Sequence, residues 1–130
     1  MKAGFPIVIE VPRSPVSLNV FMRLHWSKRL ADKKDWANYL WHLVDQRKRK
    51  RLIQAAALNQ KMRVSVHVQH PRLFDEDNLH GGGMKPLFDA LKQCGYIHDD
   101  SPRFVERNVT QVQHRERRTV VSLEPLEGRK

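Results

Sequence analysis

The sequence has 130 residues, of which 40% are hydrophobic and 29% are charged, as is typical of one globular domain and too short for two. No hydrophobic run approaches the roughly 20 residues of a membrane-spanning helix, and the single cysteine, Cys94, excludes an intrachain disulfide. The N-terminal sequence does not resemble a signal peptide, so we expect a cytoplasmic protein without a membrane partner. The formal net charge of +10 favours a polyanionic partner, above all nucleic acid.

The first half of the chain predicts a strand followed by a helix. Ile7, Ile9 and Val11 alternate around Val8 and Glu10, which predicts a strand that Pro12 ends. Hydrophobic residues between positions 26 and 44 recur with a helical period, which predicts a helix from Trp26 with Ser27 as a candidate N-cap. We expect its tryptophans to anchor the core rather than to stack on bases.

Basic residues gather on this helix and in a run that follows it. Two interpretations stay open for them: a solvated helical surface, or contacts to phosphate groups. Residues 52–58 either continue the helix or form a second one, and Asn59 is a stop signal. The candidate DNA-binding residues are Lys28, Arg29, Lys33, Lys34, Arg47, Lys48, Arg49, Lys50 and Arg51.

A second strand is predicted over residues 62–70, where hydrophobic and polar side chains alternate. Pro71 ends its regular pairing. Asp75 and Asp77 follow shortly after, and in an extended chain their i, i+2 spacing places both side chains on one side. We therefore expect two carboxylates just beyond a strand end, where the sheet holds them in place.

A glycine-rich loop and a second main helix come next. Gly81–Gly83 predict a flexible or tightly turning loop. Hydrophobic residues then recur at i, i+3, i+4 and i+7, which predicts a helix that begins near Met84 or Lys85 and ends at Gly95. Lys85 and Asp89 project away from its hydrophobic face.

Two further strands are predicted over residues 104–113 and 119–123. The polar residues 114–118 between them predict an antiparallel hairpin with a basic tip. The order of elements is then β-α-β-α-β-β. We expect one α+β domain over residues 1–130, with a mixed sheet of about four strands and two main helices.

Aspartates are concentrated in one short stretch of this basic chain. Carboxylates repel one another unless a cation lies among them, and hard divalent ions such as Mg²⁺ and Mn²⁺ take carboxylate oxygens as ligands. Such ions support phosphodiester hydrolysis, and a nearby lysine binds the phosphate. The alternative is a set of solvated loop aspartates, with a Lys85–Asp89 ion pair worth about 0.3 kcal/mol. The aspartates are Asp75, Asp77, Asp89, Asp99 and Asp100.

The order of these residues resembles the RusA-type Holliday-junction resolvases, small endodeoxyribonucleases often found in phages and prophages. The family pattern is D-x-D-N, a lysine, F-D-A-L and then D-D. It appears here as Asp75-Glu76-Asp77-Asn78, Lys85, Phe88-Asp89-Ala90-Leu91 and Asp99-Asp100, and the resemblance covers mainly residues 62–102. It implies a RusA-like fold and a Mg²⁺-dependent endonuclease that resolves four-way DNA junctions in recombination and repair.

The resemblance also implies the roles of individual residues. Asp75, Asp77 and Asp100 would bind the metal, with Asp99 as a further candidate ligand, and Lys85 would be the essential lysine. From their positions beside the ligands, we expect Asn78 and Asp89 to orient them. The chain is three residues longer than the best-known family member between Asn78 and Lys85, so the role of Lys85 depends on how the glycines are accommodated. The family further implies a homodimer, whose two sites match the near two-fold symmetry of a four-way junction.

Two other functions stay open. The first is a non-catalytic basic DNA-binding protein of the same fold, which predicts salt-sensitive binding without metal dependence. The second is a metal-dependent nuclease that acts on other branched DNA or on RNA, because the same chemistry serves many substrates.

Overall fold

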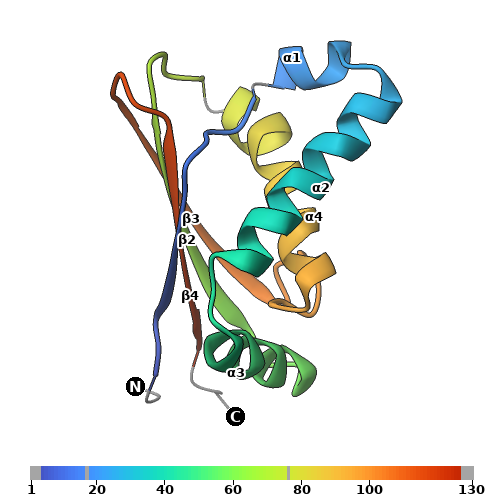
Figure 1. The fold of residues 1–130 in the computed structure, drawn as a ribbon, viewed down its shortest axis with the longest axis vertical. Helices are drawn as coiled ribbons and strands as arrows, with labels where there is room; N and C mark the ends of the chain where they lie inside the picture. Colours follow the sequence, from blue (N-terminus) through green and yellow to red (C-terminus); the bar gives the residue numbers. More distant parts are fainter. Residues whose placement is uncertain (1–3, 17, 76, 127–130) are drawn as a thin grey trace.

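The computed structural model describes residues 4–16, 18–75 and 77–126, which form one α+β domain. Helices cover one face of a four-stranded mixed sheet, and the opposite face carries none of the helices in the described ranges (Figure 1). The α+β fold with a four-stranded mixed sheet is therefore as predicted. The elements are β1 (Ile7–Val11), α1 (Leu18–Arg23), α2 (Trp26–His42), α3 (Gln46–Ala57), β2 (Met62–His70), the π-helix η1 (Asn78–Gly83), α4 (Met84–Cys94), β3 (Val105–Gln113) and β4 (Arg118–Pro125).

The strands follow the order β1-β4-β2-β3 across the sheet. β4 is antiparallel to both β1 and β2, whereas β2 and β3 are parallel. Val66 at the centre of β2 lies opposite Val109 in β3 and Val121 in β4. A parallel pair needs a crossover connection, and here η1 and α4 provide it against the covered face.

The predicted hairpin between residues 104–113 and 119–123 is wrong. Both strands exist, but β2 lies between β3 and β4 and pairs with each of them, so the described sheet has no β3–β4 ladder. The connection passes the end of β2, where His114 N donates to His70 O at 2.9 Å. A short polar link favours a hairpin locally, but the long-range pairing of β2 overrides it.

Alternation along β2 is confirmed, because its hydrophobic side chains are buried under the helices. They meet buried residues of α2 and α4, which pack against each other above the sheet. Trp36 of α2 and Phe88 of α4 are among the largest side chains with no exposed surface. At about 25 cal/mol per Å² of apolar surface, this layer is the main source of stability.

Of the two possibilities left open for residues 52–58, the second helix is the one observed, because α2 and α3 are separate helices with a corner between them. α2 begins at Trp26 as expected, but its N-cap is His25, whose Nδ1 accepts from Ser27 N at 3.3 Å, so the assignment of Ser27 is wrong. Asp45 starts α3 by accepting from Lys48 N at 2.8 Å. The basic run 47–51 therefore lies in the first turns of α3. Asn59 has a φ of 56° and follows the end of α3, as its stop signal predicted.

The tryptophans do not share one environment. Trp36 is fully buried and anchors the core as predicted, whereas Trp26 is 63% exposed, so that prediction is wrong for Trp26. Trp41 is partly exposed and stacks on Tyr96, with ring centroids 6.5 Å apart and planes within 3°. In Figure 1 the start of α2 lies farther from the sheet than its C-terminal half, which agrees with the exposure of Trp26.

The three glycines do not form the predicted loop. Residues 78–83 form η1, which continues directly into α4. α4 begins at Met84 as expected, and Gly95 ends it with a φ of 82°. Gly95 N donates to Lys92 O and Tyr96 N to Leu91 O, both at 3.0 Å, which is the Schellman arrangement that a terminal glycine favours.

Candidate active site

The backbone that leads to Asp75 is fixed to strand β3 by one side chain. Gln111 Nε2 donates to Phe74 O at 2.6 Å, and Gln111 Oε1 accepts from Phe74 N at 3.0 Å. The same oxygen lies 2.9 Å from His70 Nε2, and because an amide oxygen only accepts, His70 carries a proton on Nε2. Gln111 therefore holds the chain between β2 and Asp75 in place.

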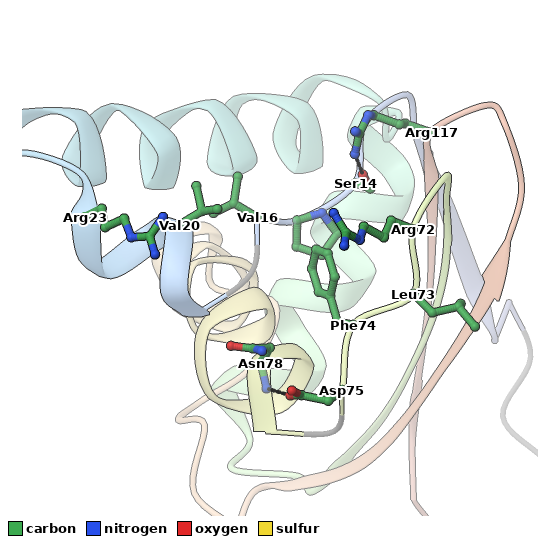
Figure 2. Close-up of a pocket in the computed structure, with 11 residues that line it drawn as sticks. Ser14, Val16, Val20, Arg23, Arg72, Leu73, Phe74, Asp75, Asn78 and Arg117 are labelled. Atoms are coloured by element: carbon green, nitrogen blue, oxygen red, sulfur yellow. Dashed lines mark hydrogen bonds between the residues drawn. The ribbon is translucent and has the colours of Figure 1, made fainter.

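Asp75 starts the helical segment η1. Its Oδ1 accepts from Asn78 N at 2.9 Å, and its backbone oxygen accepts from Leu79 N at 3.0 Å (Figure 2). Asp77 occupies the N-cap position of η1, is exposed and makes no capping bond with its side chain. Glu76 lies outside the described residues. The Asp75 carboxylate thus accepts a hydrogen bond from the start of η1, while Asp77 faces solvent.

Lys85 lies between two carboxylates at the start of α4. Its Nζ is 3.1 Å from Asp89 Oδ1 and 3.6 Å from Asp100 Oδ2. The hydrogen bond to Asp89 raises the pKa of Lys85 above its ordinary value, against the opposing effect of partial burial. Lys85 is therefore firmly protonated and links Asp89 to Asp100.

Asp89 also binds a cation from α2, with Lys33 Nζ 3.0 Å from its Oδ2. Burial alone would raise the pKa of Asp89, but hydrogen bonds from Lys33 and Lys85 outweigh it and hold that pKa below its ordinary value. Asp89 therefore ties α2 to α4 and fixes the position of Lys85. Lys33, which the sequence suggested as a DNA contact, is an ion-pair partner within the fold.

Asp100 has a second cationic neighbour that the sequence analysis missed. Arg107 Nη2 lies 4.0 Å from Asp100 Oδ2 and 3.4 Å from its backbone oxygen, and the guanidinium stacks 4.0 Å from the centroid of Phe88. Asp99 pairs instead with Lys92 Nζ, at 3.1 Å, which lowers the pKa of Asp99. The neighbouring aspartates thus face different cations.

The predicted metal ligands are not gathered into one site. Carboxylates have the donor chemistry that Mg²⁺ prefers. Yet within residues 4–16, 18–75 and 77–126, no three His, Cys, Asp or Glu side chains lie close enough to hold a metal ion. Asp75 is engaged with η1, and Asp100 with Lys85 and Arg107. As arranged, these residues do not form a metal site, and their assignment as ligands stays a prediction.

Some basic residues of α3 contact the protein backbone, and others are exposed to solvent. Arg49 Nη1 donates to the backbone oxygens of Trp41 and Val44 at 2.8 and 2.5 Å, so Arg49 braces the corner between α2 and α3. Arg51 is half-buried and its Nη1 lies 3.4 Å from Gly4 O. The exposed members of the run are Arg47, Lys48 and Lys50.

Exposed basic groups lie at both ends of the molecule. On α2, Lys28 and Lys34 are exposed, whereas Arg29 is half-buried. α3 lies at the opposite end of the sheet from α1 and η1 (Figure 1). The basic run of α3 is therefore remote from the segment that holds Asp75.

Gln111 and Arg107 were not assigned to this region by the sequence analysis, although the sequence contains a signal for both. Gln111 and Arg107 both occupy positions of β3 on the side covered by helices, as the register with β2 shows. Polar or charged residues at positions where a hydrophobic side chain is expected indicate a built interaction. That signal was present in the alternation of residues 105–113.

No protein-family model matches the sequence, and no curated protein is similar enough to it to count as a relative. None of the helices in the described part of the chain is both long enough and hydrophobic enough to cross a bilayer.

Proposed function

We propose that the chain is a RusA-type endodeoxyribonuclease that cleaves four-way DNA junctions by Mg²⁺-dependent phosphodiester hydrolysis. The observation that carries the proposal is the ion pair between Lys85 and Asp100, with Nζ and Oδ2 at 3.6 Å. It joins the lysine and the final acidic pair of the motif across the start of α4.

Lys85 is suited to bind the scissile phosphate in this proposal. Its side chain is 54% exposed, so a phosphate can approach it from solvent. Asp89 holds the ammonium from one side and is itself held by Lys33, which restrains Lys85 before DNA binds. A preorganised cation of this kind favours the charge that develops at the phosphate.

The cofactor in this proposal is Mg²⁺ or Mn²⁺, with Asp75, Asp77 and Asp100 as ligands and Asp99 as a further candidate. Because these carboxylates are not gathered in the described structure, the assignment requires a rearrangement. The segment that begins η1 and the loop before β3 would have to approach each other. Asn78 would then orient the Asp75 carboxylate through the hydrogen bond that its backbone N–H donates to Asp75 Oδ1.

Branched DNA is the proposed substrate because basic groups lie at both ends of the molecule. The arms of a four-way junction diverge, so residues such as Lys28 and Lys34 on α2 would contact one arm and the exposed residues of α3 another. A homodimer would supply two sites for two symmetric cuts. The proposed setting is DNA recombination and repair in the cytoplasm.

A second candidate function is DNA binding without catalysis. Since no three metal-binding side chains are gathered in the part of the chain that the structure describes, a non-catalytic basic DNA-binding protein of this fold also accounts for the charge. It would bind junctions in a salt-sensitive manner, with the same affinity in metal and in chelator. A nuclease specific for other branched DNA or for RNA would instead cut those substrates in preference.

The experiment that tests the proposal is cleavage of a labelled four-way junction beside a linear duplex, with Mg²⁺, with Mn²⁺ and with chelator. We expect paired symmetric nicks in the junction that require the metal. Asp77→Asn should abolish cleavage and leave junction binding intact, because it removes a charge from an exposed side chain without a structural bond.

The matched control is Asp35→Asn, which changes the same group at an exposed position on α2 whose nearest cation is a long 3.9 Å pair with Arg13. It should cleave like the unmodified protein. Normal cleavage by Asp77→Asn would refute the metal assignment. Tight junction binding without cleavage would refute the nuclease proposal and support a non-catalytic DNA-binding protein.

A further inference from the structure

A pocket of about 620 Å³ lies beside Asp75, between the 14–16 segment, α1 and the segment that follows β2 (Figure 2). This volume is within the roughly 300–1,000 Å³ of pockets that bind small molecules or parts of larger ones. Asp75 and Asn78 form one edge of it. Neither the sequence motif nor the proposed cleavage chemistry accounts for the remaining walls.

Three arginines give the pocket a strong positive charge. Arg23 extends from α1 and Arg72 from the opposite wall, and in Figure 2 their guanidinium groups extend toward each other. Arg23 and Arg72 are both exposed, and neither pairs with a carboxylate of the described residues. Arg117 is fixed at the rim by a bond from its Nη1 to Ser14 Oγ at 2.9 Å. The charge is therefore available for an anion.

The rest of the wall is apolar. Phe74, Pro15, Val16 and Val20 line the pocket, and the phenylalanine ring lies within it in Figure 2. The ring packs edge-on against His70, with centroids 4.5 Å apart, and its backbone is held by Gln111. A phosphate alone needs no such wall, whereas a planar base gains contact from an aromatic ring and aliphatic groups.

We propose that this pocket binds one unpaired nucleotide of a DNA strand, with its phosphate on Arg23 and Arg72 and its base against the apolar wall. A base inside a duplex is stacked and paired, so it enters a concave pocket only after it leaves the stack. The choice of DNA as the ligand rests on the proposed function. The pocket adds a source of selectivity for branch points, where such nucleotides are least costly to expose.

Binding is tested with chelator present, so that cleavage plays no part. The probes are a fluorescent duplex, the same duplex with one unpaired thymidine, and the same duplex with an unpaired abasic sugar phosphate. By fluorescence anisotropy, we expect the thymidine bulge to bind about tenfold more tightly than either other probe. The abasic probe carries the same phosphates, so it isolates the contribution of the base.

Arg23→Ala/Arg72→Ala should remove this preference. The control is Arg103→Ala/Lys61→Ala, which removes the same charge at exposed positions near the starts of β3 and β2, at the far ends of these strands from the pocket. It should weaken all probes alike and keep the preference. Val16→Phe fills the pocket without changing charge and should also abolish the preference. Thermal unfolding of each variant verifies that it folds.

Three results would overturn the pocket assignment: equal affinity for the thymidine and abasic bulges, a preference that survives in Arg23→Ala/Arg72→Ala, or an equal loss of preference in the control. The outcome is separate from that of the nuclease proposal. A protein that selects the bulge but never cuts junctions keeps the pocket and loses the nuclease. One that cuts junctions equally well without the two arginines keeps the nuclease and loses the pocket.

Discussion

Replacing Gln111 by alanine should destabilise the protein by about 2 kcal/mol, because one side chain makes three hydrogen bonds to the segment before Asp75. Each bond contributes about 1 kcal/mol net, and partial access of water to the half-buried Phe74 recovers some of the loss. A domain of this kind has roughly 5–15 kcal/mol of stability, so the protein should still fold. Its melting temperature should fall by roughly 7 °C.

Urea unfolding followed by circular dichroism measures this difference, with Gln113→Ala as the matched control. Gln113 lies two residues further along β3, is exposed, and donates one bond, from Nε2 to Pro71 O at 3.1 Å. Its replacement should cost about 0.5 kcal/mol. If the two variants unfold at the same urea concentration, Gln111 does not fix the segment that carries Asp75.

Three more predictions concern the core and its charges. Tyr96→Phe removes the buried bond from Tyr96 Oη to Leu40 O and should cost about 1 kcal/mol in urea unfolding, whereas Tyr39→Phe at an exposed site should cost almost nothing. Burial raises the pKa of the Cys94 thiol to about 11. A thiol reagent at pH 8 should therefore label the folded protein at least about a hundredfold more slowly than protein unfolded in urea. Equal labelling rates would contradict the burial of Cys94. The lowered pKa of Asp89 means that its ion pairs stabilise the fold above the ordinary carboxyl pKa and that this contribution is lost as pH falls through the lowered value. The stability difference between the unmodified protein and Asp89→Asn should therefore be full at pH 7 and shrink below about pH 4; a difference that does not change with pH would refute the argument.

Local patterns predicted much of the fold because their causes are local. The alternation of residues 62–70 predicted a strand with one buried face, and β2 has it. The helical period from Met84 and the glycine at position 95 predicted α4 and its end, since a positive φ costs glycine little. These features depend on neighbours a few residues apart, which a sequence contains in full.

The errors have a common physical origin in contacts between distant segments. The order of the strands depends on β2 entering between β3 and β4, which no feature of residues 114–118 reveals. The exposure of Trp26 depends on how far the start of α2 lies from the sheet (Figure 1). Gly81–Gly83 have weak local preferences, so packing of η1 against α1 decides their conformation.

In the candidate site, too, features that depend on local spacing were predicted and contacts from other elements were not. Asp75 beyond a strand end and the i, i+4 pair of Lys85 with Asp89 follow from spacing alone. Lys33 reaches the acidic stretch from α2, 56 positions before Asp89, and Arg107 from β3, seven positions after Asp100; neither was assigned to it. The function assigned to these residues stays a prediction, because cleavage depends on how the aspartates are arranged when DNA and metal are bound.

The position of β4 has a consequence for how the chain is made. β4 is synthesised after the other strands of the described sheet, yet it lies between β1 and β2 and pairs with both. While β4 is still inside the ribosome, β1 has no neighbour and β2 has only β3. The nascent chain therefore exposes hydrophobic strand edges of β1 and β2 until β4 has emerged from the ribosome, and these long-range pairings slow the completion of the sheet.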